Sequence, residues 1–418
     1  MTPERRRWFV FAVLACAYAL VAIYRLSTAV LSESLAVAFD ASGAELGTLH
    51  AMFFVVYALL QLPAGVVADR AGARWSVAGG TVTFAVGGLA FALAPSYPMA
   101  LAARALIGVG ASFLFIAILR FCANWFRPGE FARMSGLTIA VAGFGGILAT
   151  TPLALAVTAF GWRETMTGVA LLGLLLAVLV VLVARDSPAD AGYEPIHGVP
   201  TPEAPRLREV AGNVRRVLRE PETWLAGLVL FAGTGINVTV FGLWGVPYVV
   251  QTYGLPVTGA STFTLLGSAG LLVGPPVVGA ISDRLGRRTE VIVTGMGLYM
   301  GAFALLALLG DPPLAVVGVC FFAGGFLAGA YALSYAVVKE RHPAAASGVS
   351  TGTINTIGFT GAAVLPTAMG LILDSYATGR TIGGAPVYSV AGYRVAFALA
   401  AGVAFVAFCC AVGLHVRG

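Results

Sequence analysis

The residues of this sequence that could carry chemistry are arginines placed inside apolar stretches. Arg25 follows Trp8 by 17 residues, which is about 25 Å along a helix. A charge at the centre of a membrane span costs at least about 2.5–3.5 kcal/mol, so such a residue needs a functional or structural reason. The planar guanidinium group binds carboxylate or phosphate through paired N–H groups. Arg25 is therefore predicted to bind an anionic ligand.

The spacing around Arg25 indicates which side chains accompany it. Tyr18 and Ser32 lie seven residues to either side and share one stripe of a helix with Arg25. An alternative is that Arg25 extends to the membrane surface or pairs with Glu33. Polar or aromatic residues in other apolar runs are further candidates for binding: Tyr57, Gln61, Asn237, Trp244, Tyr331, Tyr335 and Asn355. The alternative is that such side chains join helices to one another.

Three further residues in or near the apolar runs each have more than one possible role. Arg120 ends an apolar run and is predicted either to bind the anion or to reach the lipid headgroups. Glu33 and His50 are the two candidates for coupling transport to a proton, and exchange of anions is the alternative. Arg104, next to Gly108 in the chain's fourth apolar run, is expected to be structural.

The composition indicates that membrane-spanning helices position these residues. The chain has 418 residues, of which 59% are hydrophobic and 11% charged, and its mean hydropathy is +0.90. Soluble domains carry about 25% charged residues, so a soluble enzyme, a disordered chain and a nucleic-acid binder are excluded. The 53 glycines and 21 prolines do not interrupt the apolar runs, which is typical of packed membrane helices.

Twelve transmembrane helices fit a chain of this length, at roughly 35 residues for each span and its connection. A polar, proline-containing linker at 185–221 separates a six-helix half at 1–184 from another at 222–418, and its last part is expected to form an amphipathic surface helix. The predicted spans are 8–37, 46–67, 75–94, 97–122, 134–159, 164–184, 222–250, 258–280, 289–309, 313–338, 346–373 and 392–415.

The basic residues predict the orientation of the chain. Of the 25 Lys and Arg residues, 19 lie at the termini, in the linker and in alternate loops, 3 lie in the other loops and 3 lie inside spans. Because basic loops stay in the cytoplasm, both termini and the linker are predicted to be cytoplasmic.

A repeated motif relates the two halves. Residues 65–74 read Gly-Val-Val-Ala-Asp-Arg-Ala-Gly-Ala-Arg, and residues 279–288 read Gly-Ala-Ile-Ser-Asp-Arg-Leu-Gly-Arg-Arg, 214 positions later. Gly72 and Gly286 suit a tight turn. An aspartate at a helix end can pair with arginine and face a helix N-terminus, so the contact can form in one conformation and break in another. Two homologous halves imply parallel repeats about an axis normal to the membrane.

These features resemble the major facilitator superfamily over the whole chain. Both copies of the loop look like its signature motif, and 104–110 resembles its fourth-helix arginine–glycine motif. The resemblance implies an all-α membrane fold of twelve helices, and it implies that the loops form a conformational latch. The first loop departs from the family pattern at Ala73, where a basic residue is common. The latch residues would be Asp69, Arg70, Arg74, Asp283, Arg284, Arg287 and Arg288.

The sequence Tyr24-Arg25-Leu26-Ser27 resembles the first helix of the family's organic-anion permeases, which carry sugar phosphates or carboxylates. The resemblance implies that Arg25 contacts the anion and that Arg120 is a second cavity arginine. Those permeases often have an acid beside the first arginine, whereas this chain has Tyr24. Residues 274–276, Gly-Pro-Pro, are expected to break or kink the eighth helix.

Absences narrow the function further. The spans carry no central Asp or Glu, and the fifth span lacks a Gly-Pro pair, which argues against a pump for cationic drugs. The sequence has no nucleotide-binding loop, and its four His and five Cys residues lack metal-ligand or disulfide spacing. No enzyme activity, cofactor or metal is therefore predicted.

The sequence thus predicts a secondary transporter of a small organic anion, acting by alternating access in the inner or plasma membrane. Its expected partners are the anion, the lipid bilayer and a coupling proton or counter-anion, with no nucleic acid, and it is expected to be a monomer. One alternative is an efflux pump for neutral or amphiphilic compounds. Another is a transporter-like sensor that binds a ligand and signals to a partner.

Overall fold

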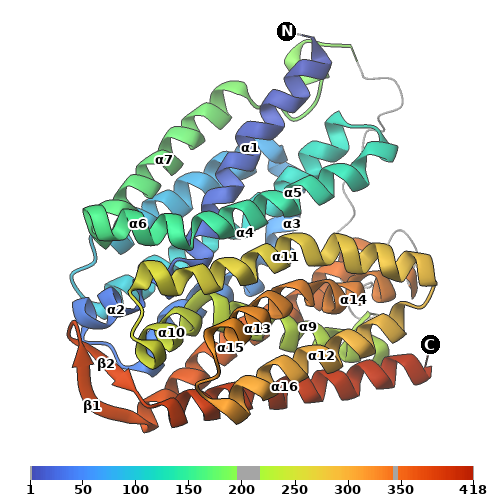
Figure 1. Cartoon of the computed structure of the whole chain (residues 1–418). Helices are drawn as coiled ribbons and strands as arrows, with labels where there is room; N and C mark the ends of the chain where they lie inside the picture. Colours follow the sequence, from blue (N-terminus) through green and yellow to red (C-terminus); the bar gives the residue numbers. More distant parts are fainter. Residues whose placement is uncertain (1, 195–216, 342–346, 418) are drawn as a thin grey trace.

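The computed structural model describes residues 2–194, 217–341 and 347–417, except for the side chains of 62, 69, 128, 129, 132 and 347–349. The helices of the first half, coloured blue to green in Figure 1, lie beside those of the second half, coloured yellow to red. Helices α5 and α6 of the first half run along α11 of the second half.

Long apolar helices account for nearly the whole described chain. Eleven of them are long and apolar enough to span a membrane, and one bent pair brings the number to twelve, which agrees with the prediction. In the first half the helices are α1 (Pro3–Leu26), α2 (Thr28–Phe39), α3 (Gly43–Ala92), α4 (Tyr97–Trp125), α5 (Pro128–Leu148), α6 (Thr151–Phe160) and α7 (Trp162–Val183). In the second half they are α9 (Pro221–Thr239), α10 (Gly245–Tyr253), α11 (Val257–Leu285), α12 (Arg288–Leu309), α13 (Leu314–Phe326), α14 (Ala328–Arg341), α15 (Ser347–Ser375) and α16 (Val390–Arg417).

Between the halves, α7 ends at Val183 and α9 begins at Pro221, and a short 3-10 turn, η1 (Ala189–Ala191), lies between them. The division of the chain at 185–221 stays a prediction. The expected amphipathic helix of the linker falls largely on residues 195–216, outside the described part of the chain.

Several predicted spans are interrupted helices. The predicted span 8–37 consists of α1 and α2, which meet at Ser27. The span 134–159 is bent by 41° between α5 and α6, and α6 restarts with a proline in its first turn, where the missing N–H costs nothing. Leu327 separates α13 from α14, and a π-helical turn, η2 (Val240–Trp244), joins α9 to α10.

Two predicted spans, 46–67 and 75–94, belong to the single element α3, which turns at Gly72. Gly72 has φ 78°, and Gly286 in the matching loop has φ 64°, so both positions use a backbone conformation that suits glycine. The predicted turns are thereby confirmed.

The sequence predicted a break or a kink at Gly274-Pro275-Pro276, and the break is wrong, because α11 continues through these residues. A Cβ atom on Gly274 would lie 2.0 Å from the carbonyl oxygen of Phe326, so α11 packs backbone to backbone against the end of α13. Packed membrane helices tolerate proline in this way, since neighbouring helices support the backbone. The interruption occurs instead in the neighbouring helix, at Leu327.

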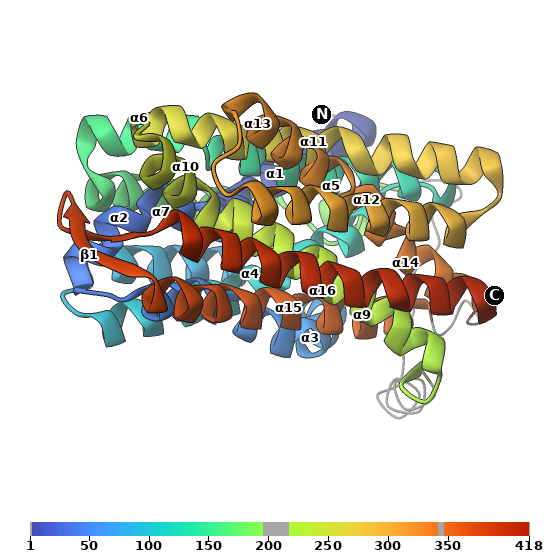
Figure 2. The same cartoon turned by 60° about the horizontal axis from the view of Figure 1, so that its bottom comes forward.

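The long loop after α15 contains an antiparallel hairpin that the all-helical prediction did not include. Its strands are β1 (Ala377–Ile382) and β2 (Ala385–Tyr388). The hairpin lies at the end of the molecule opposite the C-terminus (Figure 2). We call this end the hairpin end, and the opposite end, where α7 ends and α9 begins, the linker end.

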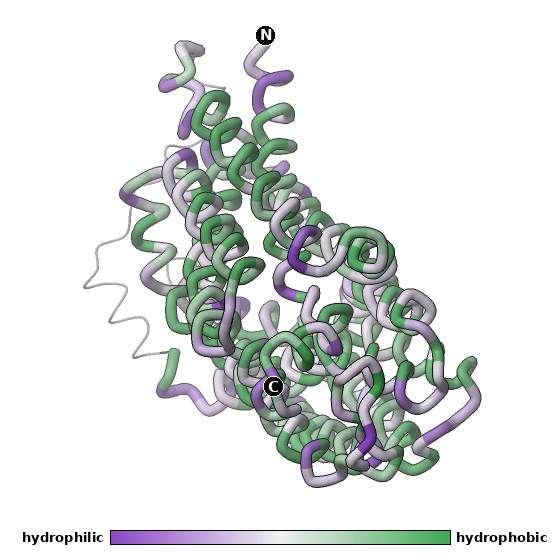
Figure 3. The backbone as a smooth tube through the Cα atoms, turned by 90° about the vertical axis from the view of Figure 1, so that its left-hand side faces the viewer, coloured by the Kyte–Doolittle hydropathy of each residue, from purple (hydrophilic) through white to green (hydrophobic). Residues whose placement is uncertain are grey.

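Hydrophobic residues follow the helices, and hydrophilic residues gather at turns and chain ends (Figure 3). Small residues allow the helices to approach closely. A Cβ atom on Gly110 of α4 would lie 2.3 Å from the backbone nitrogen of Phe84 in α3. Such contacts between small residues are the usual source of packing energy between helices in lipid.

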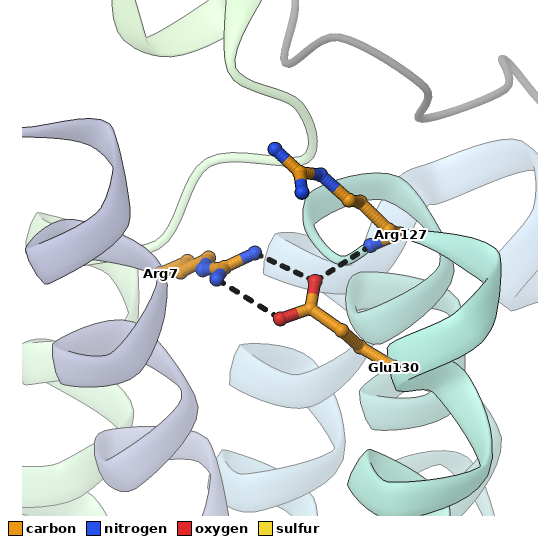
Figure 4. Close-up of polar contacts among 3 residues, drawn as sticks. All are labelled: Arg7, Arg127 and Glu130. Atoms are coloured by element: carbon orange, nitrogen blue, oxygen red, sulfur yellow. Dashed lines mark hydrogen bonds and ion pairs between the residues drawn. The ribbon is translucent and has the colours of Figure 1, made fainter.

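At the linker end, Glu130 joins α1 to α5 (Figure 4). Its carboxylate accepts two hydrogen bonds from the Arg7 guanidinium, at 2.9 and 3.1 Å, and one from the backbone N–H of Arg127, at 3.0 Å. The Arg127 N–H and the Arg7 side chain lower the pKa of this carboxyl from its ordinary value of 4.5.

The variant Glu130→Gln should therefore be less stable at pH 7, by about 1 kcal/mol, because it loses a helix cap and a partly exposed ion pair. The folded-state pKa lies below the unfolded one, so the carboxylate stabilises the fold above pH 4.5, and this contribution disappears as the pH falls through the folded pKa. Thermal unfolding in detergent across pH 3 to 7 measures the difference. A deficit that does not shrink in acid would contradict the assignment, and Glu290→Gln, which loses only an exposed pair with Arg287, is the control.

Candidate substrate-binding site

A small cavity lies where the two halves meet. The first half contributes residues of α1, α3 and α5, and the second half contributes one residue of α15. The cavity leaves about 10 Å³ for the centre of a water-sized sphere, which is the space of about one water molecule. Its lining residues are Tyr18, Val21, Ala22, Arg25, Phe53, Tyr57, Ala142 and Phe359.

Arg25 supplies the positive charge of this lining. Its guanidinium carbon lies 5.5 Å from the ring centroid of Phe54 and 5.0 Å from that of Phe359, so it contacts aromatic rings of both halves. Within the described residues no carboxylate lies within ion-pair distance of Arg25, and the alternative pairing with Glu33 is not formed. Arg25 is only half buried, so the group remains open to the cavity.

The position of Arg25 follows from the break between α1 and α2. The break leaves the Tyr24 carbonyl without its usual partner in the helix, and this oxygen accepts hydrogen bonds from Arg104 Nη1 at 2.7 Å and from Ser27 Oγ at 3.2 Å. Arg104 is fully buried on α4, and its Nε also donates to the Leu49 carbonyl at 3.3 Å. Arg104 therefore has the structural role expected from the sequence, and it holds the backbone beside Arg25.

Tyrosines surround Arg25 on both halves. Tyr18 and Tyr57 line the cavity, and Tyr331 and Tyr335 of α14 lie within electrostatic range of the guanidinium. The Tyr335 hydroxyl donates to Asn355 Oδ1. Three of the predicted binding residues line the cavity, namely Tyr18, Arg25 and Tyr57, whereas Tyr331, Tyr335 and Asn355 are absent from its lining.

Four other predicted binding residues are absent from the lining of the cavity. The Trp244 indole donates to the Pro366 carbonyl at 3.1 Å and packs against Tyr388, near the hairpin end. Asn237 and Gln61 are buried, with amide nitrogens that find no hydrogen-bond partner among the described residues. Arg120 is half buried on α4 and is absent from the lining of the cavity.

The two coupling candidates both lie where the halves touch. His50 is fully buried, and its ring faces η2, where a Cβ atom on Gly242 would lie 2.8 Å from His50 Cε1. Neither ring nitrogen makes a hydrogen bond of ordinary geometry within the described chain, although the Val238 backbone lies close. Glu33 on α2 is half buried, its Oε1 atom is enclosed without a partner among the described residues, and Tyr393 lies within electrostatic range.

The predicted latch residues make contacts within their own halves. In the second half Arg288 contacts Asp283 at 3.3 Å and Glu340 at 2.9 Å, and Arg287 contacts Glu290 at 3.2 Å. Arg284 is exposed.

In the first half the Arg74 backbone N–H donates to Asp186 at 2.8 Å, and its guanidinium donates to the Val181 carbonyl. Arg70 is exposed, and the side chain of Asp69 lies outside the described residues. The latch role itself stays a prediction.

The aromatic residues Phe54 and Phe359 were missed by the sequence reasoning. Their types are ordinary for an apolar helix, and only the folded chain shows that both rings lie on Arg25. A metal is not indicated either, since no three His, Cys, Asp or Glu side chains of the described chain are grouped to hold an ion.

Known proteins share this architecture. The sequence model of the Major Facilitator Superfamily matches residues 8–366 and 247–417. The hexuronate transporter of Bacillus subtilis is 26% identical over 87% of this chain and 86% of its own length. The membrane sensor protein UhpC of Salmonella typhimurium is 23% identical, covering 86% of this chain and 81% of that protein.

Among solved structures, a bacterial homologue of the human lysosomal transporter Spinster, in an inward-facing and occupied conformation, has a TM-score of 0.79 with 16% identity. It covers 99% of this chain and 97% of that chain, so it supports the fold. The family resemblance and the membrane fold predicted from the sequence are confirmed. The prediction that the chain is not an enzyme is also confirmed, because the family consists of membrane transporters.

The variant Arg104→Ala should lower the stability of the fold by about 2 kcal/mol or more, because the Tyr24 and Leu49 carbonyls lose a charged donor in a buried site. Thermal unfolding in detergent measures this loss. Arg5→Ala, at an exposed arginine, is the matched control and should leave the midpoint unchanged. Equal midpoints for the two variants would show that Arg104 does not support the break.

Proposed function

The chain belongs to the Major Facilitator Superfamily, and we propose that it is a secondary active transporter that moves a small organic anion by alternating access. The observation that carries this proposal is the state of Arg25. Its guanidinium is half buried at the junction of the two halves, lines a cavity and has no carboxylate partner among the described residues. A charge held in this way is a ready site for an anionic ligand.

The chemistry around Arg25 suits a carboxylate or a phosphate ester. The guanidinium offers a planar fork of N–H donors to two oxygen atoms. Tyr18 and Tyr57 add phenolic hydroxyls from the same wall, which suit hydroxyl groups on the ligand. The relatives support this class, since one is named a hexuronate transporter. Arg120 remains a second anion-binding candidate, on α4.

The size of the cavity supports a cycle in which the halves move. Space for about one water cannot hold an organic anion, so the walls around Arg25 must separate when the substrate enters. The basic residues favour a cytoplasmic linker end, with both termini inside the cell. In that orientation the hairpin end faces outward.

The variant Arg25→Ala should weaken anion binding by about 100-fold or more, because the ligand loses a charged, paired hydrogen-bond donor. Thermal stabilisation of the purified protein by D-glucuronate, tartrate and glucose 6-phosphate measures binding, since a ligand at about 100 times its Kd adds roughly 2.7 kcal/mol. Arg25→Lys keeps the charge without the planar fork and should bind at an intermediate level. Arg5→Ala, at an exposed arginine away from the cavity, should bind like the natural protein.

The same assay separates the alternatives. Stabilisation by lipophilic cations or neutral compounds alone would overturn the anion proposal and favour efflux. Binding that depends on Arg25, without any flux in proteoliposomes, would favour a sensor, a role that one relative carries in its name. Uptake of a stabilising anion that disappears in Arg25→Ala supports the proposal.

We propose Glu33 as the coupling group, because its enclosed carboxyl oxygen lacks a partner among the described residues where the halves meet. Glu33→Gln should then abolish uptake driven by a pH gradient and leave exchange of anion for anion intact, because exchange moves no proton. Proteoliposomes with and without internal anion measure both modes, with His50→Gln as the companion variant. Selective loss in His50→Gln would move the role to the histidine, and uptake that always needs internal anion would establish exchange.

A further inference from the structure

We propose that the start of α1 and the start of α5 form a binding site for the phosphate of an anionic phospholipid, at the linker end of the first half. The site consists of Trp8 on α1, Arg133 on α5 and Arg127, which directly precedes α5. The lining of the cavity around Arg25 includes none of these residues. The inference therefore does not depend on the proposed transport function.

A contact between Trp8 and Arg133 joins the two helices at the surface. The Arg133 guanidinium carbon lies 5.9 Å from the ring centroid of Trp8, so the cation rests against the indole. The Trp8 ring also packs edge-on against Phe126, with 5.3 Å between the centroids. Arg7, which is largely buried, is bound by Glu130 and lies over the same Phe126 ring at 4.6 Å. The exposed pair therefore rests on a fixed layer of side chains.

The exposed groups of this cluster retain free hydrogen-bonding capacity. Arg127 and Arg133 are exposed, and no carboxylate of the described residues lies within ion-pair distance of either guanidinium. In Figure 4 the dashed line from Arg127 to Glu130 starts at the backbone nitrogen, so the Arg127 side chain stays available. The Trp8 indole N–H has no acceptor within the described chain. Glu4, one turn before Trp8, is exposed and pairs with neither arginine among these residues.

The ligand of this cluster comes from the membrane. Trp8 and Phe9 are 38% and 45% exposed on a helix that is apolar enough to span a bilayer, so this face of α1 contacts lipid. Tryptophan is typical of the boundary between lipid tails and headgroups. Arginine binds phosphate oxygens through paired N–H groups, and basic sites between membrane helices bind anionic headgroups. A phosphodiester headgroup can therefore accept hydrogen bonds from the arginines and the indole together.

The surface next to the cluster also leaves room for an acyl chain. About one turn deeper along each helix, the small residues Ala12 on α1 and Gly136 on α5 are exposed. A Cβ atom on Gly136 would meet nothing within 4 Å, so the space beside it is open. The predicted cytoplasmic orientation of the linker end would place the headgroup in the leaflet with the negative surface potential.

The start of α9 shows the same residue types with their groups already satisfied. Trp224 is 47% exposed, but its indole N–H donates to the Leu218 carbonyl at 2.9 Å. Glu222 pairs with Arg341 at 3.5 Å. An exposed tryptophan near arginines is therefore not sufficient for a site, and this region of the second half supplies matched controls.

The test measures how much anionic lipid is needed to stabilise the protein. Dioleoylphosphatidylglycerol is titrated into the purified full chain in detergent, and the midpoint of thermal unfolding is followed. Arg133→Ala should raise the half-maximal lipid concentration about fivefold, which is the typical contribution of one arginine to binding an anionic lipid surface. Arg219→Ala, at an exposed arginine five residues before Trp224, is the matched control and should leave that concentration unchanged.

Trp8→Phe is the second variant. It keeps an aromatic ring and removes the indole N–H, so it should raise the half-maximal concentration about threefold, the effect of one hydrogen bond. Trp224→Phe is its control, because the Trp224 N–H is used within the chain. Equal half-maximal concentrations in Arg133→Ala, Trp8→Phe and the two controls would overturn the site.

Two comparisons identify the source of the phosphate. Zwitterionic dioleoylphosphatidylcholine and water-soluble glycerol 1-phosphate should each stabilise the protein less than the anionic lipid, and equal stabilisation by either would refute an anionic-lipid site. The titration is repeated with Arg25→Ala, where the effect of the lipid should persist. Its loss there would place the lipid in the cavity and overturn a separate site at the start of α1 and α5.

Discussion

A lipid bilayer supplies no water to a charge or to a carbonyl released from its helix, so each must find its partner inside the protein. The guanidinium of Arg104 meets this requirement for the break between α1 and α2, since it binds the carbonyl oxygens of Tyr24 and Leu49. The cavity depends on that contact. Because the backbone is held at Tyr24, the next residue, Arg25, can present its charge between the halves without a carboxylate partner among the described residues.

The two arginines show how the same residue type takes opposite roles in one membrane protein. Arg104 is fully buried, and its hydrogen bonds tie three helices together. Arg25 is half buried, and its guanidinium lies against the rings of Phe54 and Phe359. Aromatic faces attract a cation but leave the edge of the guanidinium without hydrogen-bond acceptors. Arg104 thus has carbonyl partners for Nε and Nη1, although its Nη2 finds no partner among the described residues. The presence of these backbone partners distinguishes the structural charge of Arg104 from the candidate binding charge of Arg25.

Part of the candidate site could be predicted because its residues are spaced so that they share one face of a helix. The spacing of seven residues placed Tyr18 beside Arg25, and both line the cavity. Contacts between distant segments could not be read in this way. Trp244 has the residue type of a binding group, yet its indole N–H donates its hydrogen bond to the Pro366 carbonyl. Phe359 has no distinguishing local pattern, because its importance arises from the residues that α3 places opposite it.

The sequence by itself determined the class of the protein, because its hydropathy required membrane helices and its motifs resembled those of the family. It also predicted two related halves and an anion site at Arg25, and both stay predictions. These conclusions depend on local composition and periodicity, which survive without knowledge of the packing. Only the tertiary structure decided which spans break, that Gly274-Pro275-Pro276 does not break α11, that a hairpin forms after α15, and that the halves touch through Gly43, Gly47, Gly370 and Asp374. The physical reason is that these features are set by contacts between segments that are not neighbours in the sequence, from Gly274 and Phe326 to Gly43 and Asp374, where the absence of a side chain or one hydrogen-bond partner decides the outcome.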